Sequence, residues 1–378
     1  MKSSEEYLVH LLRSVLLGEK PQEKPDGFSF GEVYRASAFH NVDSMAFYGI
    51  DRLEVKPDEK LYNEWKRKKD QCIILSFNQL HQCGEIVKKF RENNIKTMPL
   101  KGSLLKEMYP SPEYRQMADV DLLIESDKAQ KAQQLMHSMG YTTRIFGNES
   151  VDEYSLPPYM NVEIHSRMVA VEYKYSWYYD DIWDKVIEDR DENGNPSGQY
   201  HLSWNDYYIY LLVHTAKHFE HCGTGIRSFM DIFVFMRKHR ADIDDEYIDN
   251  ELKKLDLCEF RKMAEKLAYI WFGDEEYDEK SREMEKYVFS SGAYGTFSQK
   301  IENHINDIKD ENTTIGKAKV KYFFSRTFLK YEYMCGHYTI LRKVPVLLPF
   351  CWIHRLAYAL IHKSGKVRSE IDNINKIK

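Results

Sequence analysis

Hydrophobic residues recur at helical spacing through the first part of the chain. Apolar positions three or four residues apart place their side chains on one face of a helix. The repeat runs through Tyr7, Leu8, Leu11, Leu12 and Val15, through Val33, Ala36, Phe39 and Val42, and along residues 58–93. This spacing predicts an N-terminal helical region over residues 1–93.

The pattern changes at residue 94 to short apolar runs separated by turn residues. Strands are predicted at 95–100, 118–124, 141–146 and 160–165, and helices at 104–109 and 126–139. Gly140 follows the second helix in the position of a helix-ending glycine. This alternation predicts a compact unit of sheet and helix over residues 94–187.

Helical periodicity returns after a polar, turn-rich stretch at 188–198, which is predicted to be a linker. Helices are expected at 206–219 and 226–237 and intermittently to the end of the chain. These elements predict a C-terminal helical domain over residues 199–378.

The longest apolar run, 344–361, lies within this domain and contains two prolines and the pair His354–Arg355. It is therefore predicted to be a buried helix and not a membrane span, and no integral membrane segment is expected. The alternative is a contact with a membrane surface, because basic residues flank the run on both sides. These residues are Lys343, Lys363, Lys366 and Arg368.

Composition narrows the class of protein. A hydrophobic content of 43% is enough for sizeable cores, and a net charge of -5 gives no overall excess of positive charge for gripping nucleic acid. The six cysteines form no CxxC pair and no regular interval, which fits reduced thiols in a cytoplasmic protein.

Two acidic residues alternate with apolar residues in the predicted strand 118–124. Asp119 and Asp121 are two positions apart, so both side chains point to the same face. Neighbouring carboxylates repel each other unless a cation lies between them, and Mg²⁺ prefers carboxylate, water and phosphate oxygens. Glu163, between Val162 and Ile164, is the candidate for a third acid from a neighbouring strand. Asp119, Asp121 and Glu163 are therefore predicted to bind metal and to be catalytic.

A glycine turn follows the first predicted strand. Gly102 allows a phosphate to approach the backbone closely, and the following helix would present free N–H groups to it. Ser103 adds a hydroxyl donor and Lys101 a cation, so Lys101, Gly102 and Ser103 are predicted to bind the phosphates of a nucleotide.

These segments resemble a known superfamily. The runs LKGSLLKEMYP, YRQMADVDLLI and NVEIHSRM resemble polymerase-beta-like nucleotidyltransferases, and more narrowly the uncharacterised bacterial nucleotidyltransferase family with the signature KG…R…DxDLL…H. The resemblance implies an α+β fold, with a small mixed-sheet nucleotidyltransferase core at 94–187 flanked by the two helical regions. It also implies that Gly102 and Ser103 bind the triphosphate and that the three acids bind the metal ions.

The predicted function is transfer of a nucleoside monophosphate from a nucleoside triphosphate to an acceptor hydroxyl with release of pyrophosphate. ATP is the favoured triphosphate. The expected cofactor is Mg²⁺, with Mn²⁺ as the alternative, and a small-molecule acceptor is favoured over tRNA or protein. The alternative hypotheses are a non-catalytic nucleotide-binding regulatory protein on the same fold and a transferase that modifies tRNA or protein.

Several charged residues near this core have both a functional and a structural interpretation. Arg115 could contact phosphate oxygens, brace Asp119 through a bidentate pair, or lie on the surface. His165 shares the face of Glu163 and could donate to a metal-bound carboxylate, contact the substrate or be structural.

Four residues of the predicted helix 206–219 and its end share one face, namely His214, Lys217, His218 and His221. They are interpreted as a cationic face toward the triphosphate or acceptor, with Lys217 as the binding residue, or as solvent-exposed side chains. Arg227 and Asp231 are spaced for an ion pair within one helix or for lining a cleft.

Overall fold

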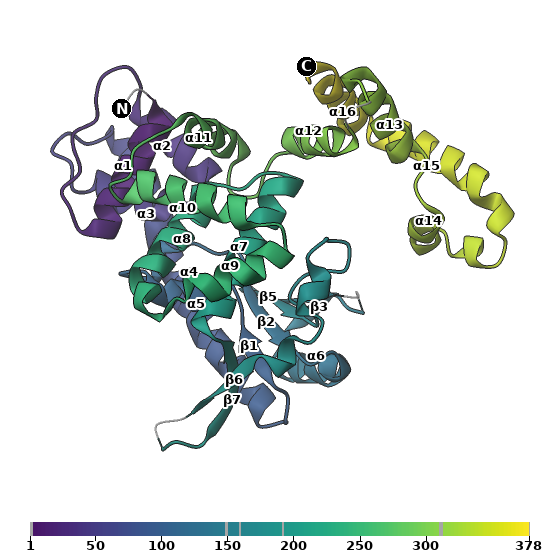
Figure 1. The fold of residues 1–378 in the computed structure, drawn as a ribbon, viewed down its shortest axis with the longest axis horizontal. Helices are drawn as coiled ribbons and strands as arrows, with labels where there is room; N and C mark the ends of the chain where they lie inside the picture. Colours follow the sequence, from purple (N-terminus) through teal and green to yellow (C-terminus); the bar gives the residue numbers. More distant parts are fainter. Residues whose placement is uncertain (1–2, 148–149, 159, 191–192, 310–312, 378) are drawn as a thin grey trace. The chain divides into compact units, whose positions relative to one another are not determined.

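The computed structural model describes residues 3–147, 150–158, 160–190, 193–309 and 313–377 (Figure 1). These residues form two compact units, each described by itself. The first contains residues of 1–217 and 224–293, and the second contains residues of 218–223 and 294–378. This division follows packing, whereas the regions 1–93, 94–187 and 199–378 follow sequence pattern and stay predictions.

One mixed sheet organises the first unit. Its strand order is β3-β4-β5-β2-β1-β7-β6, with β2 parallel to β5 and β1 parallel to β7. All other neighbouring strands are antiparallel. The strands are β1 (Thr97–Pro99), β2 (Val120–Ile124), β3 (Thr142–Ile145), β4 (Val151–Leu156), β5 (Met160–His165), β6 (Val186–Arg190) and β7 (Pro196–Leu202). An α+β fold with a mixed sheet and flanking helical regions is thereby confirmed.

Helices of the first unit precede, interrupt and follow the sheet (Figure 1). They are α1 (Ser4–Leu17), α2 (Phe30–Phe39), α3 (Asp43–Ile50), α4 (Glu59–Arg91), α5 (Gly102–Leu105), α6 (Ala129–Ser138), α7 (Trp204–His221), α8 (Ile226–His239), α9 (Asp245–Lys254), α10 (Cys258–Phe272) and α11 (Glu279–Ser291). The helices predicted at 206–219 and 226–237 are confirmed as α7 and α8. Gly140, at φ +88°, ends α6 as expected.

A hydrophobic core lies between the sheet and the helices α4 and α6. The alternate residues Val120, Leu122 and Ile124 of β2 join Val162 and Ile164 of β5 in this core. Side chains of α4 and α6 complete it, among them Ile86, Phe90, Ala132 and Met136. Because side chains alternate along a strand, Asp121 and Glu163 face the other side of the sheet.

The sequence pattern missed three strands. β4 lies between β3 and β5, and the stretch predicted as a linker at 188–198 belongs largely to the antiparallel hairpin of β6 and β7. The linker prediction is therefore wrong for the described residues of that stretch. Its polar and turn residues reflect a hairpin whose strands are partly exposed, with Gly194 at φ +81° in the turn.

The second unit is helical within the described residues. Its helices after α7 are α12 (Phe297–Ile308), α13 (Ile315–Thr327), α14 (Tyr331–His337), α15 (Leu348–His362) and α16 (Ser364–Lys376). The helix predicted within 344–361 is present as α15, but the expectation that it is buried is wrong, since Cys351 is its one buried residue. Every described helix is too short or too polar to cross a membrane.

A buried lysine joins α4 to the segment that leads to the acids. Lys106 is 1% exposed, and its ammonium donates to Ser76 Oγ at 2.7 Å and to Gln79 Oε1 at 3.1 Å. The Gln79 amide in turn donates to the carbonyl of Met117 at 3.0 Å. The buried polar side chains of α4 therefore hold the chain just before Asp119.

Lys106 should make the stability of the protein depend on pH. Burial lowers its pKa to about 8, below the pKa of a lysine in the unfolded chain. The unfolded chain then binds more protons above about pH 8, so the stability contribution of Lys106 rises with pH. The free energy of unfolding of the wild type minus that of Lys106→Met should increase by about 2 kcal/mol between about pH 7 and about pH 10.

Urea denaturation at a series of pH values measures this difference. Lys88→Met, at an exposed position of α4, controls for the loss of a lysine charge at the surface. The prediction would be contradicted if the free energy of unfolding changed with pH in the same way for the wild type and for Lys106→Met across this range.

Candidate active site

Neighbouring parallel strands bring two of the predicted acids together. Asp121 of β2 and Glu163 of β5 are register partners, and His165 follows two positions later on the same face. Asp119 immediately precedes β2. The structure thus places the acids on the side of the sheet that faces away from α4 and α6.

Asp121 is the most strongly paired of these acids. Its side chain is 6% exposed, and its Oδ1 lies 2.7 Å from Lys101 Nζ and 2.8 Å from His165 Nε2. Burial by itself would raise the pKa of Asp121, but the Lys101 ammonium and the His165 imidazole hold this pKa well below its usual value. Because the ionised carboxylate can only accept, His165 Nε2 is the donor.

One ligand atom from each of Asp121, Glu163 and His165 can be chosen so that all three lie within 4.8 Å of one another. His165 Nε2 is 3.4 Å from Glu163 Oε2, and the Glu163 side chain is 30% exposed, so this edge of the group is open to ligands. Carboxylate oxygens suit Mg²⁺ and Mn²⁺. The two carboxylates therefore fit a divalent cation, whereas His165 Nε2 carries the hydrogen that it donates to Asp121.

Asp119 lies beside this group without belonging to it. Burial, followed by the negative charges of Asp121 and Glu163, raises the pKa of Asp119 to about 6. A carboxylate with a raised pKa near two other acids is in a place where a cation would stabilise its charged form.

The turn after β1 places a cation against Asp121. Lys101 has φ +46° and ψ -117°, a conformation that residues with a side chain seldom adopt. The Tyr207 hydroxyl of α7 donates to the Lys101 carbonyl at 3.1 Å and helps to hold this turn. α5 has only four residues, so the helix dipole adds less here than the sequence suggested.

Arg115 braces a different aspartate from the expected one. Its Nε and Nη2 donate to the two carboxylate oxygens of Asp231 at 2.8 and 2.7 Å, and the Tyr109 hydroxyl donates to the same carboxylate. The predicted brace on Asp119 is therefore wrong. So is the predicted pair within α8, because Asp231 is taken by Arg115 and Arg227 donates to the carbonyl of Gln116 at 2.7 Å.

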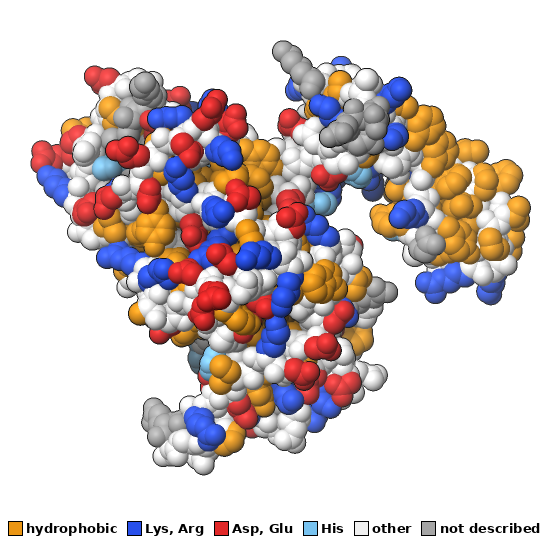
Figure 2. Space-filling model, in the orientation of Figure 1, with side chains coloured by type: hydrophobic (Ala, Val, Ile, Leu, Met, Phe, Trp, Pro, Cys, Tyr) orange, Lys and Arg blue, Asp and Glu red, His pale blue; other side chains and the backbone are white. Residues whose placement is uncertain are grey.

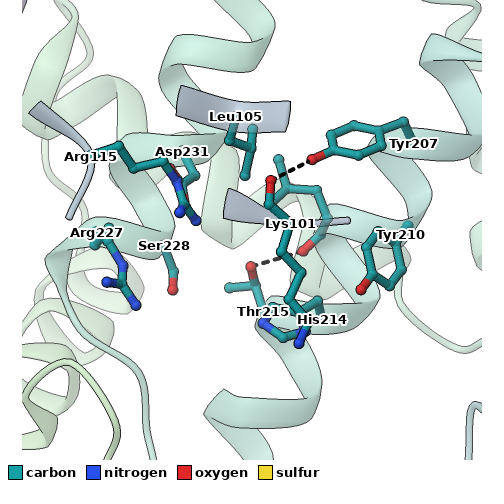
Figure 3. A pocket seen from close by; sticks show the side chains of 11 residues that line it. Lys101, Leu105, Arg115, Tyr207, Tyr210, His214, Thr215, Arg227, Ser228 and Asp231 are labelled. Atoms are coloured by element: carbon teal, nitrogen blue, oxygen red, sulfur yellow. Dashed lines mark hydrogen bonds and ion pairs between the residues drawn. The ribbon is translucent and has the colours of Figure 1, made fainter. Parts of the chain in front are cut away.

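A pocket next to Lys101 is lined by residues of α7 and α8 (Figure 3). Arg115 and Arg227 lie on one side of the view, and Tyr210 and His214 lie near the Lys101 side chain. The complete lining is Lys101, Leu105, Arg115, Tyr207, Tyr210, Leu211, His214, Thr215, Arg227, Ser228 and Asp231.

The side of α7 next to the acids includes tyrosines that precede the predicted histidine-rich face in the sequence. Tyr210 is 1% exposed, and its hydroxyl has no hydrogen-bond partner among the described residues. Burial and the charges of Asp121 and Glu163 raise the pKa of Tyr210 well above its usual value. Burial and Lys101 lower the pKa of Lys217 to about 8, and its ammonium lies 4.8 Å from the centre of the Tyr173 ring.

The sequence pattern singled out Lys217 on this helix, which stays a prediction, but not Tyr207 and Tyr210, which line the pocket. A signal was present, because Tyr207, Tyr210, His214 and Lys217 recur every three or four residues along α7. Tyrosines at helical spacing also occur throughout hydrophobic cores, so this signal gains meaning only beside the acids.

Gly102 should tolerate no side chain. A methyl group there would overlap Arg115 Nη1 and lie 2.8 Å from Met117 Sδ, and the pair with Asp231 prevents Arg115 from moving freely. We expect Gly102→Ala to lower the free energy of unfolding by about 1–3 kcal/mol, measured by urea denaturation.

Gly84→Ala is the matched control for this substitution. Gly84 lies inside α4 with nothing within 4 Å of the added carbon, so the alanine should raise stability by up to about 1 kcal/mol. Equal effects of the two alanines would show that Arg115 is not held against Gly102.

Comparison with known proteins identifies the family. Residues 26–273 match the family described as uncharacterised nucleotidyltransferase, and this range includes the sheet, Lys101, Asp121 and Glu163. No curated protein and no solved structure matches the chain. The resemblance seen in the sequence is confirmed, and the chain belongs to this nucleotidyltransferase family.

Proposed function

We propose that the protein transfers a nucleoside monophosphate from a nucleoside triphosphate to an acceptor hydroxyl and releases pyrophosphate. The observation that carries this proposal is the group of Asp121, Glu163 and His165 beside the turn at Lys101. Family membership supports the same class of reaction. ATP is the proposed first substrate, and the proposed acceptor is a small molecule.

Asp121 and Glu163, with Asp119 beside them, would hold the divalent cations that this reaction uses. Such cations neutralise phosphate charge and stabilise the attacking and leaving oxygens of a phosphoryl displacement. Mg²⁺ is proposed first, because carboxylates and phosphates are its preferred ligands. His165 would orient Asp121 through its Nε2 donor, as residues behind a metal ligand commonly do.

The chain's own residues would bind and orient the substrates. Gly102 would contact the triphosphate through its backbone, and Lys101 and Lys217 would place positive charge beside it. The predicted contact of Ser103 is not kept, because its N–H donates to the Leu100 carbonyl at 3.1 Å and its side chain is buried beside Cys83 of α4. The acceptor oxygen forms a bond to the α-phosphorus, and the bond from that phosphorus to the pyrophosphate oxygen breaks. Glu163, which is partly exposed, would take the proton from the acceptor hydroxyl.

The competing proposal is a nucleotide-binding protein without turnover. The observation in its favour is the ion pair of Lys101 Nζ with Asp121 Oδ1, because it neutralises a carboxylate that a catalytic cation would need. The two proposals differ in whether this carboxylate exchanges Lys101 for a divalent cation when nucleotide binds.

Removing the acids separates these proposals. Asp121→Asn and Glu163→Gln should each lower the rate of Mg²⁺-dependent pyrophosphate release by about a hundredfold or more, because each loses a negative ligand without a change of shape. The assay uses each nucleoside triphosphate with a cell extract as the source of acceptor, and a labelled α-phosphate identifies the product.

Asp152→Asn is the matched control, because Asp152 is a buried aspartate on the opposite face of the same sheet. This variant should keep its activity. Nucleotide binding without pyrophosphate release in the wild type would support the non-catalytic proposal, and full activity in Asp121→Asn would overturn the assignment of the site.

Tyr210→Phe should separate stability from activity. Removing a buried hydroxyl that has no partner among the described residues should raise the free energy of unfolding by about 1 kcal/mol. If this hydroxyl binds substrate next to Asp121 and Glu163, turnover should fall in the same variant.

Tyr154→Phe provides the comparison, because the Tyr154 hydroxyl is equally buried and likewise has no partner in the described part of the chain. Its ring lies in the core on the other side of the sheet. Thermal unfolding and pyrophosphate release should show stabilisation in both variants and lost activity in Tyr210→Phe alone. Unchanged turnover in Tyr210→Phe would remove this residue from the site.

A further inference from the structure

One exposed side of α15 is apolar. Phe350, Ile353, Leu360 and Ile361 are between 61% and 73% exposed, and their spacing places them along one side of the helix. Figure 2 shows hydrophobic side chains gathered over this helix. A helix of a soluble protein normally turns its polar side to water, so this arrangement is reversed.

The opposite edge of α15 anchors the helix to its own unit. Cys351 is buried in a small core with Met334 and Leu341, and the Trp352 indole packs there and donates to the carbonyl of Leu329 at 3.0 Å. The exposed apolar side is therefore a different side of the helix from the one that packs in the core. It is presented outward by a helix that already has a core.

Other exposed apolar side chains belong to the same unit. Val346, just before α15, is 75% exposed, and α13 and the residue after it expose Val320, Phe323, Phe324 and Phe328. Single apolar residues on a surface are ordinary, but extended apolar surface marks an interaction site.

Charge is distributed unevenly along the chain. Residues 294–378 contain 15 Lys and Arg and seven Asp and Glu, a net charge of +8, whereas the remaining 293 residues have 39 and 52, a net charge of -13. α15 itself contains no acidic residue. Exposed basic residues lie within six residues of its two ends, namely Arg342, Lys343, Lys363 and Lys366.

We propose that the second unit binds the surface of an anionic lipid bilayer, with α15 lying in the plane of the membrane interface. Its apolar side would enter the boundary between headgroups and acyl chains. The flanking lysines and arginines would reach the anionic headgroups. This inference is independent of the reaction proposed for the first unit.

Charge argues against the other occupants of this surface. A second copy of the chain would bring another strongly basic segment against the first, so repulsion opposes self-association through this surface. A nucleic acid would satisfy the positive charge but would leave the side chains of Ile353 and Leu360 in water. A bilayer surface with anionic lipids meets both the apolar and the basic features.

Vesicle flotation with the full chain tests the proposal. The protein should float with phosphatidylcholine vesicles that contain phosphatidylglycerol, and this binding should weaken with added salt and without the anionic lipid. Ile353→Glu together with Leu360→Glu should weaken the binding by about tenfold or more, because two carboxylates then face the acyl region.

Ile74→Glu is the matched control, because Ile74 of α4 is 69% exposed and Ile353 is 64% exposed. It should leave vesicle binding unchanged, and circular dichroism should show that all variants remain folded. The proposal is overturned if the wild type stays unbound with anionic vesicles, or if the glutamates of α15 leave binding intact. It is also overturned if the two glutamates of α15 abolish a concentration-dependent dimer that light scattering detects in the wild type, while vesicles capture no protein.

Discussion

The site depends on the pairing of the buried Asp121 carboxylate with Lys101 and His165. A charge inside a protein is costly unless it is paired, and Asp121 Oδ1 meets both Lys101 Nζ and His165 Nε2. Lys101 reaches it from the turn after β1, where its backbone has positive φ, and the Tyr207 hydroxyl of α7 helps to hold this turn. The core between the sheet and the helices α4 and α6 keeps the strands in the register that makes this possible.

The sequence predicted the elements whose pattern is local. Acidic and apolar residues alternate in β2 and β5, so the core side chains recur at every second position. This pattern predicts one face buried in the core and one face that carries the acids. β4 and the hairpin of β6 and β7 were not predicted, because these strands are partly exposed and their apolar residues are interrupted by polar and turn residues, a composition typical of loops. Partners far apart in the chain were also beyond such patterns: Asp231 lies 116 residues after Arg115, and the helical spacing of Arg227 and Asp231 indicated the wrong pair. An outward apolar face on α15 breaks the rule that a hydrophobic run is buried, so the rule failed there.

The two units of the chain differ in charge and in the side chains that they expose. The first unit is acidic overall in sequence and holds an acid-lined group with lysines and arginines close by, as binding of a metal and a phosphate requires. The second unit carries the basic, apolar surface that we propose for a lipid interface. If both proposals hold, the protein performs its nucleotidyl transfer while attached to a membrane surface, which would favour acceptors that are present there.

The central claim is that a divalent cation replaces Lys101 at Asp121 when nucleotide binds. A crystal structure with Mg²⁺ and a triphosphate analogue that cannot be cleaved at the α-phosphorus tests this claim most directly. We predict an ion bound to oxygens of Asp121 and Glu163, with Lys101 Nζ moved from the carboxylate to the phosphates. A nucleotide bound elsewhere, with Lys101 still paired to Asp121 and no ion between the acids, would contradict it.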